Sequence, residues 1–417
     1  MKKISNFAAD AIGRYFQSIL PTIQLSIINK IQMKRVFLFI SLAALAIVSC
    51  SKIPSGGSEP ASNMDSTFVY TASTPEYVFG FAGQNRYSYC PSVVDNGDGS
   101  TNVYFCGTKS NVFVDNIYHF QELAGGGQTK ERSVLQPSLD WDSRHDCDPS
   151  VIEGDFKMEG VSYRYAMFFL SNPMEYYYNE IGVAFSNDLA ADSWVKYPYQ
   201  VVTKPWREEG DQIWGGSNKS WGVGQPSAVS LDKKGKVLLT YTKGDKSGTN
   251  LMWRELDMSD MSNLVVGTAR YVVTDGWFMK DGKNPDFGSN SDFAINLEED
   301  RIVMVRPVHP FDKEYPAFIA SMVEVLWMPF SRFQLCQGKW KTMYRISSED
   351  TGFPRNHNAA IKRDSFGHIK EWDAPTIYFA VSKIAPDVAE SYGKYAEWTY
   401  NIYKTDIRKE YSYFEKN

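Results

Sequence analysis

A short motif that recurs five times is the feature of this sequence that most limits its fold. Its clear copies begin at Cys90, Asp148 and Gln225, each followed by Pro-Ser, and two weaker copies begin at Asp292 and Asn358. Each copy leads into a Gly or Asp turn and then a strand-like apolar run, and successive copies lie about 60 to 80 residues apart. Such repetition indicates that one structural unit is used five times.

Each unit is long enough for four short strands separated by turn signals. The sequence therefore predicts an all-β fold, a five-bladed β-propeller with four-stranded antiparallel blades around a central channel. Aromatic residues make up 15% of the chain, which favours strands over helical bundles. Helical patterns are few. The alternative is a β-sandwich with inserted hairpins, which does not account for the repeated strand start.

The first fifty residues resemble a targeting segment. From Met33 a charged start leads into the apolar run 36–49, which is too short to span a bilayer comfortably. The ending Ile47-Val-Ser-Cys50 resembles a bacterial lipobox, which implies lipidation of Cys50. We therefore predict an upstream extension and lipoprotein signal peptide (1–49), a lipidated Cys and flexible tether (50–70) and the propeller (71–417). The expected location is the cell envelope, on the outer membrane, with the leaflet and the oligomeric state left open.

Charge and cysteine content exclude two classes of partner. The chain has 44 Lys and Arg against 49 Asp and Glu, so it lacks the basic excess typical of nucleic-acid-binding proteins. Beyond Cys50 the cysteines show no CxxC or Cys/His metal-ligand spacing. We therefore interpret them as structural thiols and predict no metal and no nucleic-acid partner.

The first motif position predicts where a site would lie. In a propeller the innermost strands converge, so equivalent positions of different blades face one shared pocket. The residues assigned to this position are Cys90, Asp148, Gln225, Asp292 and Asn358.

These strand starts, together with Phe185-Ser-Asn-Asp-Leu and Asn356-His-Asn-Ala, resemble the five-bladed glycoside hydrolases of families 43, 32 and 68. The resemblance spans residues 75–410. It implies a hydrolase that cleaves a poly- or oligosaccharide with carboxylates at the propeller centre. Family 43 members are inverting enzymes with a base Asp in the first blade, a modulating Asp in the second and an acid Glu in the third.

Carried over by position, these three roles fall on Cys90, Asp148 and Gln225. A thiol and an amide do not suit the base and acid roles, so Cys90 and Gln225 are predicted to bind substrate. The candidate catalytic carboxylates are Asp148, then Asp146, two residues earlier along an extended strand, and Asp292. Inversion and retention both stay open.

Sugar rings stack on aromatic faces, and their hydroxyls bind charged and amide side chains. The further substrate-binding candidates are Trp141, Arg144, His145, Trp214, Trp221, His357 and Asn358. His145 is also a candidate for acid/base work. The acidic loop around Trp214 is equally compatible with a solvated surface. A calcium ion near His357 is compatible with the resemblance, but Ala359 replaces its Ser, so no cofactor is predicted.

Two further functions compete with hydrolysis. Cys90 and Gln225 at the key positions favour a non-catalytic, envelope-tethered glycan-binding propeller with a degenerate hydrolase site. A structural or protein-binding propeller has only the versatility of the fold in its favour.

Overall fold

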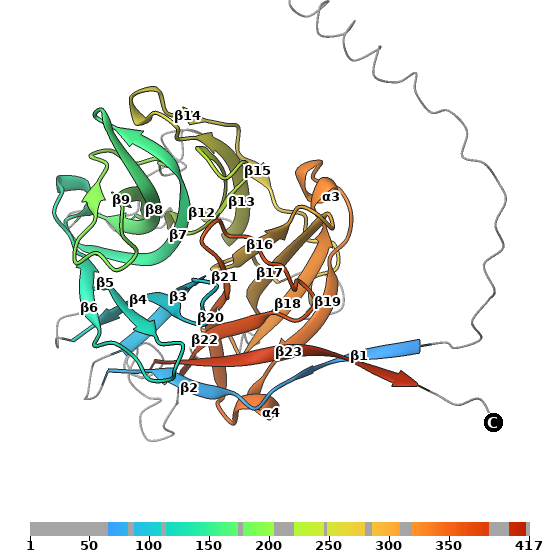
Figure 1. Cartoon of the computed structure of the whole chain (residues 1–417). Coiled ribbons are helices and arrows are strands. Elements are labelled where there is room, and N and C mark those ends of the chain that lie inside the picture. The colour runs from blue at the N-terminus through green and yellow to red at the C-terminus, as the bar shows by residue number, and fades with distance from the viewer. Residues whose placement is uncertain are drawn as a thin grey trace, which may run out of the picture. The chain divides into compact units, whose positions relative to one another are not determined.

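The computed structural model describes residues 66–81, 87–109, 114–173, 178–203, 221–245, 248–279, 286–308, 319–382 and 400–413. Its strands form five sheets arranged around a centre (Figure 1). This confirms the predicted all-β, five-bladed propeller. Among the described residues, no helix combines the length and apolar composition needed to cross a bilayer.

The blades are mainly antiparallel sheets, and in blades 1 to 4 the main strands follow one another in sequence. Blade 1 contains β3 (Tyr87–Asp95), β4 (Thr101–Thr108), β5 (Asn116–Glu122) and β6 (Arg132–Leu135). Blade 2 contains β7 (His145–Met158), β8 (Val161–Asn172), β9 (Glu180–Ser186) and β10 (Val195–Lys196). Blade 3 contains β11 (Gly222–Ser230), β12 (Lys236–Asp245), β13 (Gly248–Asp257), β14 (Val265–Val266) and β15 (Arg270–Tyr271).

Blade 4 contains β16 (Asp292–Asn296), β17 (Arg301–Val308), β18 (Met322–Pro329) and β19 (Lys341–Ile346). Blade 5 contains β20 (Arg355–Ile361), β22 (Thr376–Ser382) and β23 (Asn401–Tyr413). The short helices α3 (Phe330–Gln334) and α4 (Ser348–Thr351) lie in the connections that flank β19.

The two ends of the described chain close the ring together. β1 (Ser66–Ala72) and β2 (Glu76–Phe79) pair with β23 and complete blade 5. Residues 66–70, which the sequence assigned to the tether, are therefore strand residues of the propeller. The predicted signal peptide, Cys50 and the rest of the predicted tether lie outside the described residues.

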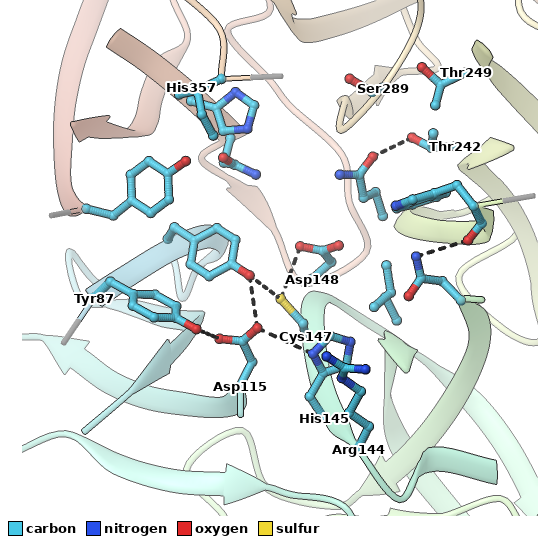
Figure 2. Close-up of a pocket in the computed structure, with 18 of the residues that line it drawn as sticks. Tyr87, Asp115, Arg144, His145, Cys147, Asp148, Thr242, Thr249, Ser289 and His357 are labelled. Carbon is cyan, nitrogen blue, oxygen red and sulfur yellow. Dashed lines mark hydrogen bonds and ion pairs between the residues drawn. The ribbon is translucent and has the colours of Figure 1, made fainter. Parts of the chain in front are cut away.

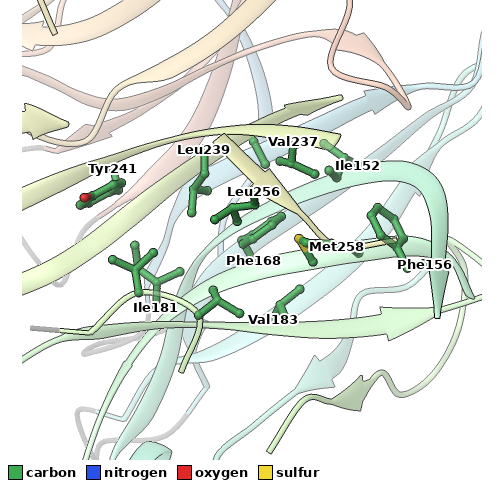
Figure 3. Close-up of a cluster of buried hydrophobic side chains, with 14 of the residues drawn as sticks. Ile152, Phe156, Phe168, Ile181, Val183, Val237, Leu239, Tyr241, Leu256 and Met258 are labelled. Atoms are coloured by element: carbon green, nitrogen blue, oxygen red, sulfur yellow. The ribbon is translucent and has the colours of Figure 1, made fainter. Parts of the chain in front are cut away.

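The hydrophobic core lies between neighbouring blades. In Figure 3, Phe168 and Val183 of blade 2 pack with Leu239 and Leu256 of blade 3. A similar cluster fills each of the other gaps between blades. Because both faces of a blade are covered, β4 and β9 are buried along their whole length. This explains why these strands are apolar runs without polar alternation.

A ring of inter-blade hydrogen bonds lies two residues after the first motif position. Each of these side-chain oxygens accepts a backbone N–H from the next blade. The pairs are Ser92 with Val151 (3.2 Å), Ser150 with Ala228 (2.9 Å), Ser227 with Phe293 (3.0 Å) and Asp292 with Ile361 (2.9 Å). We call Ser92, Ser150, Ser227 and Asp292 the hub. The equivalent residue of blade 5, Ala360, has no side-chain oxygen.

The hub corrects the predicted register of the fourth motif. Asp292 is the counterpart of the motif serine, and the counterpart of Cys90 is Asn290. A left-handed backbone marks all five first positions: φ is 47° at Cys90, 48° at Asp148, 52° at Gln225, 40° at Asn290 and 49° at Asn358. The sequence alignment missed this by two residues because Ser291 stands where the clear copies have proline.

A segment of blade 5 closes the channel beneath the hub. β21 (Arg363–Asp364) pairs in parallel with the end of β3, and the Arg363 guanidinium is buried. It lies 3.2 Å from Asp292 Oδ1, donates to Ser150 Oγ at 3.2 Å and also donates to the carbonyl of Phe293. The backbone of residues 365–369 then hydrogen-bonds to the first strands of blades 2, 3 and 4, at Glu153, Ser230 and Ile295. We call residues 363–369 the plug.

Candidate functional site

A cavity of about 490 Å³ lies at the end of the channel opposite the plug, where the first and third strands of the blades begin. This volume is within the range of ligand sites, about 300–1,000 Å³. Residues from all five blades line it: Tyr87, Tyr89, Asp115, Arg144, His145, Cys147, Asp148, Leu170, Asn179, Trp221, Gln225, Thr242, Thr249, Phe287, Ser289, Ile319, His357, Asn358 and Tyr400 (Figure 2).

The five first motif positions, which have a left-handed backbone, lie at this end of the channel. In four blades the pairing of the first and second strands shifts register across the first motif position and the residue after it, as in a β-bulge. A bulge redirects a side chain, and each left-handed non-glycine residue costs about 1–3 kcal/mol. Asn and Asp tolerate this conformation best, so Cys90 and Gln225 are the less expected occupants.

Asp115, just before β5, is one of two carboxylates among the described residues that line the cavity. The hydroxyls of Tyr87 and Tyr89 donate to its two oxygens at 2.6 and 3.1 Å. His145 Nδ1 lies 3.5 Å from Oδ2 (Figure 2). These groups hold the carboxylate in one orientation, and they suit its negatively charged form.

Asp148 is the second carboxylate, and sulfur surrounds it. The sulfurs of Cys90, Cys106 and Cys147 lie within 4.8 Å of its carboxylate, and Cys147 Sγ lies 3.4 Å from Oδ1. Burial raises the pKa of Asp148 to about 6, an effect that the Asp115 charge strengthens and the nearby Cys90 and His145 oppose. A carboxyl group with this pKa retains part of its proton near neutral pH, so it can act as an acid.

The sulfur atoms belong to a disulfide and a free thiol. Cys106 of β4 is bonded to Cys147 of β7, which joins blades 1 and 2 beneath the cavity. Cys90 is free and buried, and Cys336 is free and exposed. Among the described residues, Cys90, Cys106, Cys147 and Asp148 have ligand atoms within 4.8 Å of one another. In the disulfide form two of these sulfurs have no thiolate to offer a metal.

The other side of the cavity combines amide, imidazole and aromatic groups. Gln225 Oε1 accepts from Thr242 Oγ1 at 2.7 Å and from the Asn290 N–H at 2.8 Å. His357 Nδ1 accepts from the Ala320 N–H at 3.1 Å, so the neutral ring carries its proton on Nε2. Tyr400 stacks between His357 and Tyr89, with centroid distances of 6.3 and 5.3 Å. Such a wall suits a ring with hydroxyl groups.

The cavity brings together most of the predicted site residues. Asp148, Gln225, Arg144, His145, Trp221, His357 and Asn358 line it, and Cys90 accepts a hydrogen bond from Asn358 and lies within 4.8 Å of Asp148. Trp214 lies outside the described residues. Trp141 stacks on Phe169 and donates to the Pro198 carbonyl instead of lining the cavity.

Two predicted catalytic carboxylates lie elsewhere. Asp292 belongs to the hub and pairs with Arg363. Asp146 is buried in an ion pair with Lys196 at 2.6 Å, beside Asp142. Burial raises the pKa of Asp146 to about 7, although the Lys196 charge opposes this. Asp146 and Asp148 do not share a side because the left-handed Asp148 breaks the strand alternation.

Sequence reasoning missed Asp115, Tyr87 and Tyr89. It chose residues at and around the motif position, whereas Tyr87 and Tyr89 stand just before the motif in β3 and Asp115 stands at the start of a third strand. The third-strand residues that line the cavity share no motif: Asp115, Asn179, Thr249, Ile319 and Tyr400. The one available signal was a carboxylate directly before the apolar run of β5.

No protein family matches the sequence, and no curated protein matches it either. Among solved structures, the chain is similar to the catalytic domain of a GH62 α-L-arabinofuranosidase from Coprinopsis cinerea, with 11% identity and a TM-score of 0.51. The match covers 82% of this chain and 97% of that one.

The chain is also similar to an α-L-arabinofuranosidase from Podospora anserina that was solved in complex with cellotriose. This match has 10% identity and a TM-score of 0.50, and it covers 82% of this chain and 97% of that one. Both matches concern the fold. They agree with the propeller expected from the resemblance to glycoside hydrolases.

Proposed function

We propose that this protein hydrolyses a glycosidic bond of a poly- or oligosaccharide, with Asp115 and Asp148 as the reacting carboxylates. The observation that carries the proposal is that two buried carboxylates from adjacent blades line one cavity at the propeller centre. The fold shared with α-L-arabinofuranosidases is consistent with it. Hydrolysis of this kind needs two carboxyl groups in different protonation states.

The surroundings of the two groups suggest how the roles divide. Asp148 delivers its proton to the glycosidic oxygen as the C–O bond breaks, because its raised pKa leaves it partly protonated near neutral pH. Asp115, oriented by Tyr87, Tyr89 and His145, acts as the ionised partner that activates water or attacks the sugar. Activity should fall as pH rises above about 6, where Asp148 loses its proton.

The test compares the wild type with Asp148→Asn and Asp115→Asn on arabinan, xylan, galactan and fructan oligosaccharides. We expect each variant to lose about 10²–10⁴-fold in kcat/KM, measured by reducing-sugar release. Asp155→Asn is the matched control, because Asp155 is an exposed carboxylate on the same strand as Asp148. Full activity in Asp148→Asn would remove that residue from the mechanism.

A non-catalytic glycan-binding propeller is the second candidate. Cys90 and Gln225 favour it, because neither carries a carboxylate and both are hydrogen-bonded within the cavity wall. Glycan-array binding without turnover of any substrate would establish this function in place of hydrolysis.

We also propose that the protein is a lipoprotein anchored in the cell envelope through Cys50. The lipobox-like sequence Ile47-Val-Ser-Cys50 after an apolar run supports this. Cys50→Ala should move the protein from the membrane fraction to the soluble fraction, measured by fractionation and immunoblotting. Unchanged membrane association would contradict the lipid anchor.

A further inference from the structure

Residues 286–290, in the connection from blade 3 to blade 4, alternate between buried and more exposed positions. Asp286 and Gly288 are buried. Phe287 is 46% exposed, and it lines the cavity together with the partly exposed Ser289. Among the described residues, Phe287 is the one exposed large apolar side chain that lines the cavity. We call residues 286–290 the shelf.

The buried Arg306 side chain holds the start of the shelf. Its guanidinium lies 3.1 Å from Asp286 Oδ2 and 3.0 Å from Glu324 Oε2. It also lies over the Trp277 ring, 4.3 Å from the ring centroid. Asp286 Oδ1 in turn accepts the Phe287 N–H at 3.0 Å. Because buried charge-assisted hydrogen bonds restrict the groups that they hold, Asp286 fixes the backbone at Phe287.

Two further contacts hold the rest of the shelf. A Cβ on Gly288 would lie 2.8 Å from both the backbone nitrogen and Cγ of Leu251, so glycine is needed for this close approach. The Asn290 N–H donates to Gln225 Oε1 at 2.8 Å and to Thr242 Oγ1 at 3.0 Å. Every second residue of the shelf is therefore anchored, and the side chains between the anchors face the cavity.

We propose that Phe287 is an aromatic platform on which a sugar ring of the substrate stacks, and that the anchored shelf positions it. This inference rests on the proposed hydrolase function and adds a substrate contact to it. One face of a sugar ring carries C–H groups, which pack against an aromatic ring. Because the shelf is already held in place, little conformational entropy is lost when the sugar binds.

The first experiment measures kcat and KM of Phe287→Ala, Phe287→Leu and Phe287→Tyr on arabinan, xylan, galactan and fructan oligosaccharides. In Phe287→Ala we expect KM to rise about tenfold with kcat nearly unchanged, because stacking holds substrate and transition state equally. Phe287→Leu, which keeps an apolar side chain without a ring, should show a similar rise, and Phe287→Tyr should restore KM to within about twofold. An unchanged KM in Phe287→Ala, or a normal KM in Phe287→Leu, would overturn the platform.

Tyr199→Ala is the matched control for the loss of a ring. Tyr199 is also an exposed aromatic residue, but it does not line the cavity. KM should stay at the wild-type value in this variant. An equal rise of KM in Tyr199→Ala and Phe287→Ala would show that the effect does not come from the cavity.

A second pair of variants tests the positioning by the shelf. Gly288→Ala places a methyl group against Leu251 and displaces the shelf, so we expect KM to rise about fivefold although the Phe287 ring is intact. Gly125→Ala is the control, since a Cβ on Gly125 meets no atom within 4 Å. A normal KM in Gly288→Ala would overturn the role of the shelf.

Direct binding separates the platform from the hydrolase function. Isothermal titration calorimetry with the same oligosaccharides compares Asp148→Asn, used to prevent turnover, with the double variant that also carries Phe287→Ala. If the wild type binds a glycan but cleaves none, hydrolysis fails, and a tenfold weaker Kd in the double variant still supports the platform. If the wild type cleaves a glycan and the two Kd values are equal, the platform alone fails. Binding of none of the oligosaccharides would overturn the platform as well.

Discussion

Two rings of residues, built from the same five motifs and only two positions apart, have different tasks. The hub oxygens of Ser92, Ser150, Ser227 and Asp292 each accept a backbone N–H from the next blade. The first motif positions (Cys90, Asp148, Gln225, Asn290, Asn358) share a strained backbone but no common side chain. The hub repeats the same bond in four blades, whereas the first motif positions carry four different residue types in five blades.

The stability of the hub should depend most on the ion pair between Asp292 and the plug residue Arg363. Arg363→Ala should lower the free energy of unfolding by about 3 kcal/mol, because it removes the buried guanidinium that pairs with the half-buried Asp292. Urea denaturation measures this. Arg164→Ala is the matched control, since Arg164 pairs with Glu153 on the surface, and should cost less than about 1 kcal/mol. Equal losses would mean that the hub does not hold the blades together.

In the cavity, removing a charge should raise stability, whereas in the hub it should lower stability. The folded pKa of Asp148, about 6, lies above its ordinary value of 3.8, so the native state holds the proton more tightly than the unfolded state. Its ionisation therefore costs stability progressively between pH 4 and 6, and the penalty persists above pH 6.

Asp148→Asn removes this titration. Relative to wild type, we expect the variant to gain up to about 3 kcal/mol between pH 4 and pH 8, measured by denaturant unfolding at each pH. Asp155→Asn should show no such gain. A stability difference between Asp148→Asn and wild type that does not change with pH would show that burial does not raise the pKa of this carboxyl group.

The smallest expected effect concerns the gap in the hub. Ala360 stands where the other blades carry an oxygen, and it packs beside Val93 of blade 1. Ala360→Ser should stabilise the fold by about 0.5–1 kcal/mol if its hydroxyl accepts the Val93 N–H, as its counterparts do. Ala359→Ser is the control, because Ala359 faces an apolar cluster, and it should destabilise by about 1–2 kcal/mol. Thermal unfolding compares the two, and equal losses would mean that the ring cannot be completed at this position.

The motif predicted the fold more fully than the site. The Pro-Ser copies mark the first strands, so blade number and channel position followed from them. The fourth copy, Asn290-Ser-Asp292, lacks the proline. Without it, the motif was placed two residues late, and the hub residue Asp292 was assigned to the site. Asp146 was expected beside Asp148 because a regular strand places alternate residues together, but the left-handed turn at Asp148 cancels that rule.

By itself, the sequence determined that five similar units surround a channel and that Asp148 faces it, because repetition and strand periodicity are local properties. Only the tertiary structure shows that Asp148 lies near Asp115 and Cys90 and that Asp292 belongs to the hub. Those relations join residues from different strands and blades, and their distances depend on ring closure. A backbone that turns left-handed at one residue decides which side chain reaches the cavity, and no pattern of residue types records that turn.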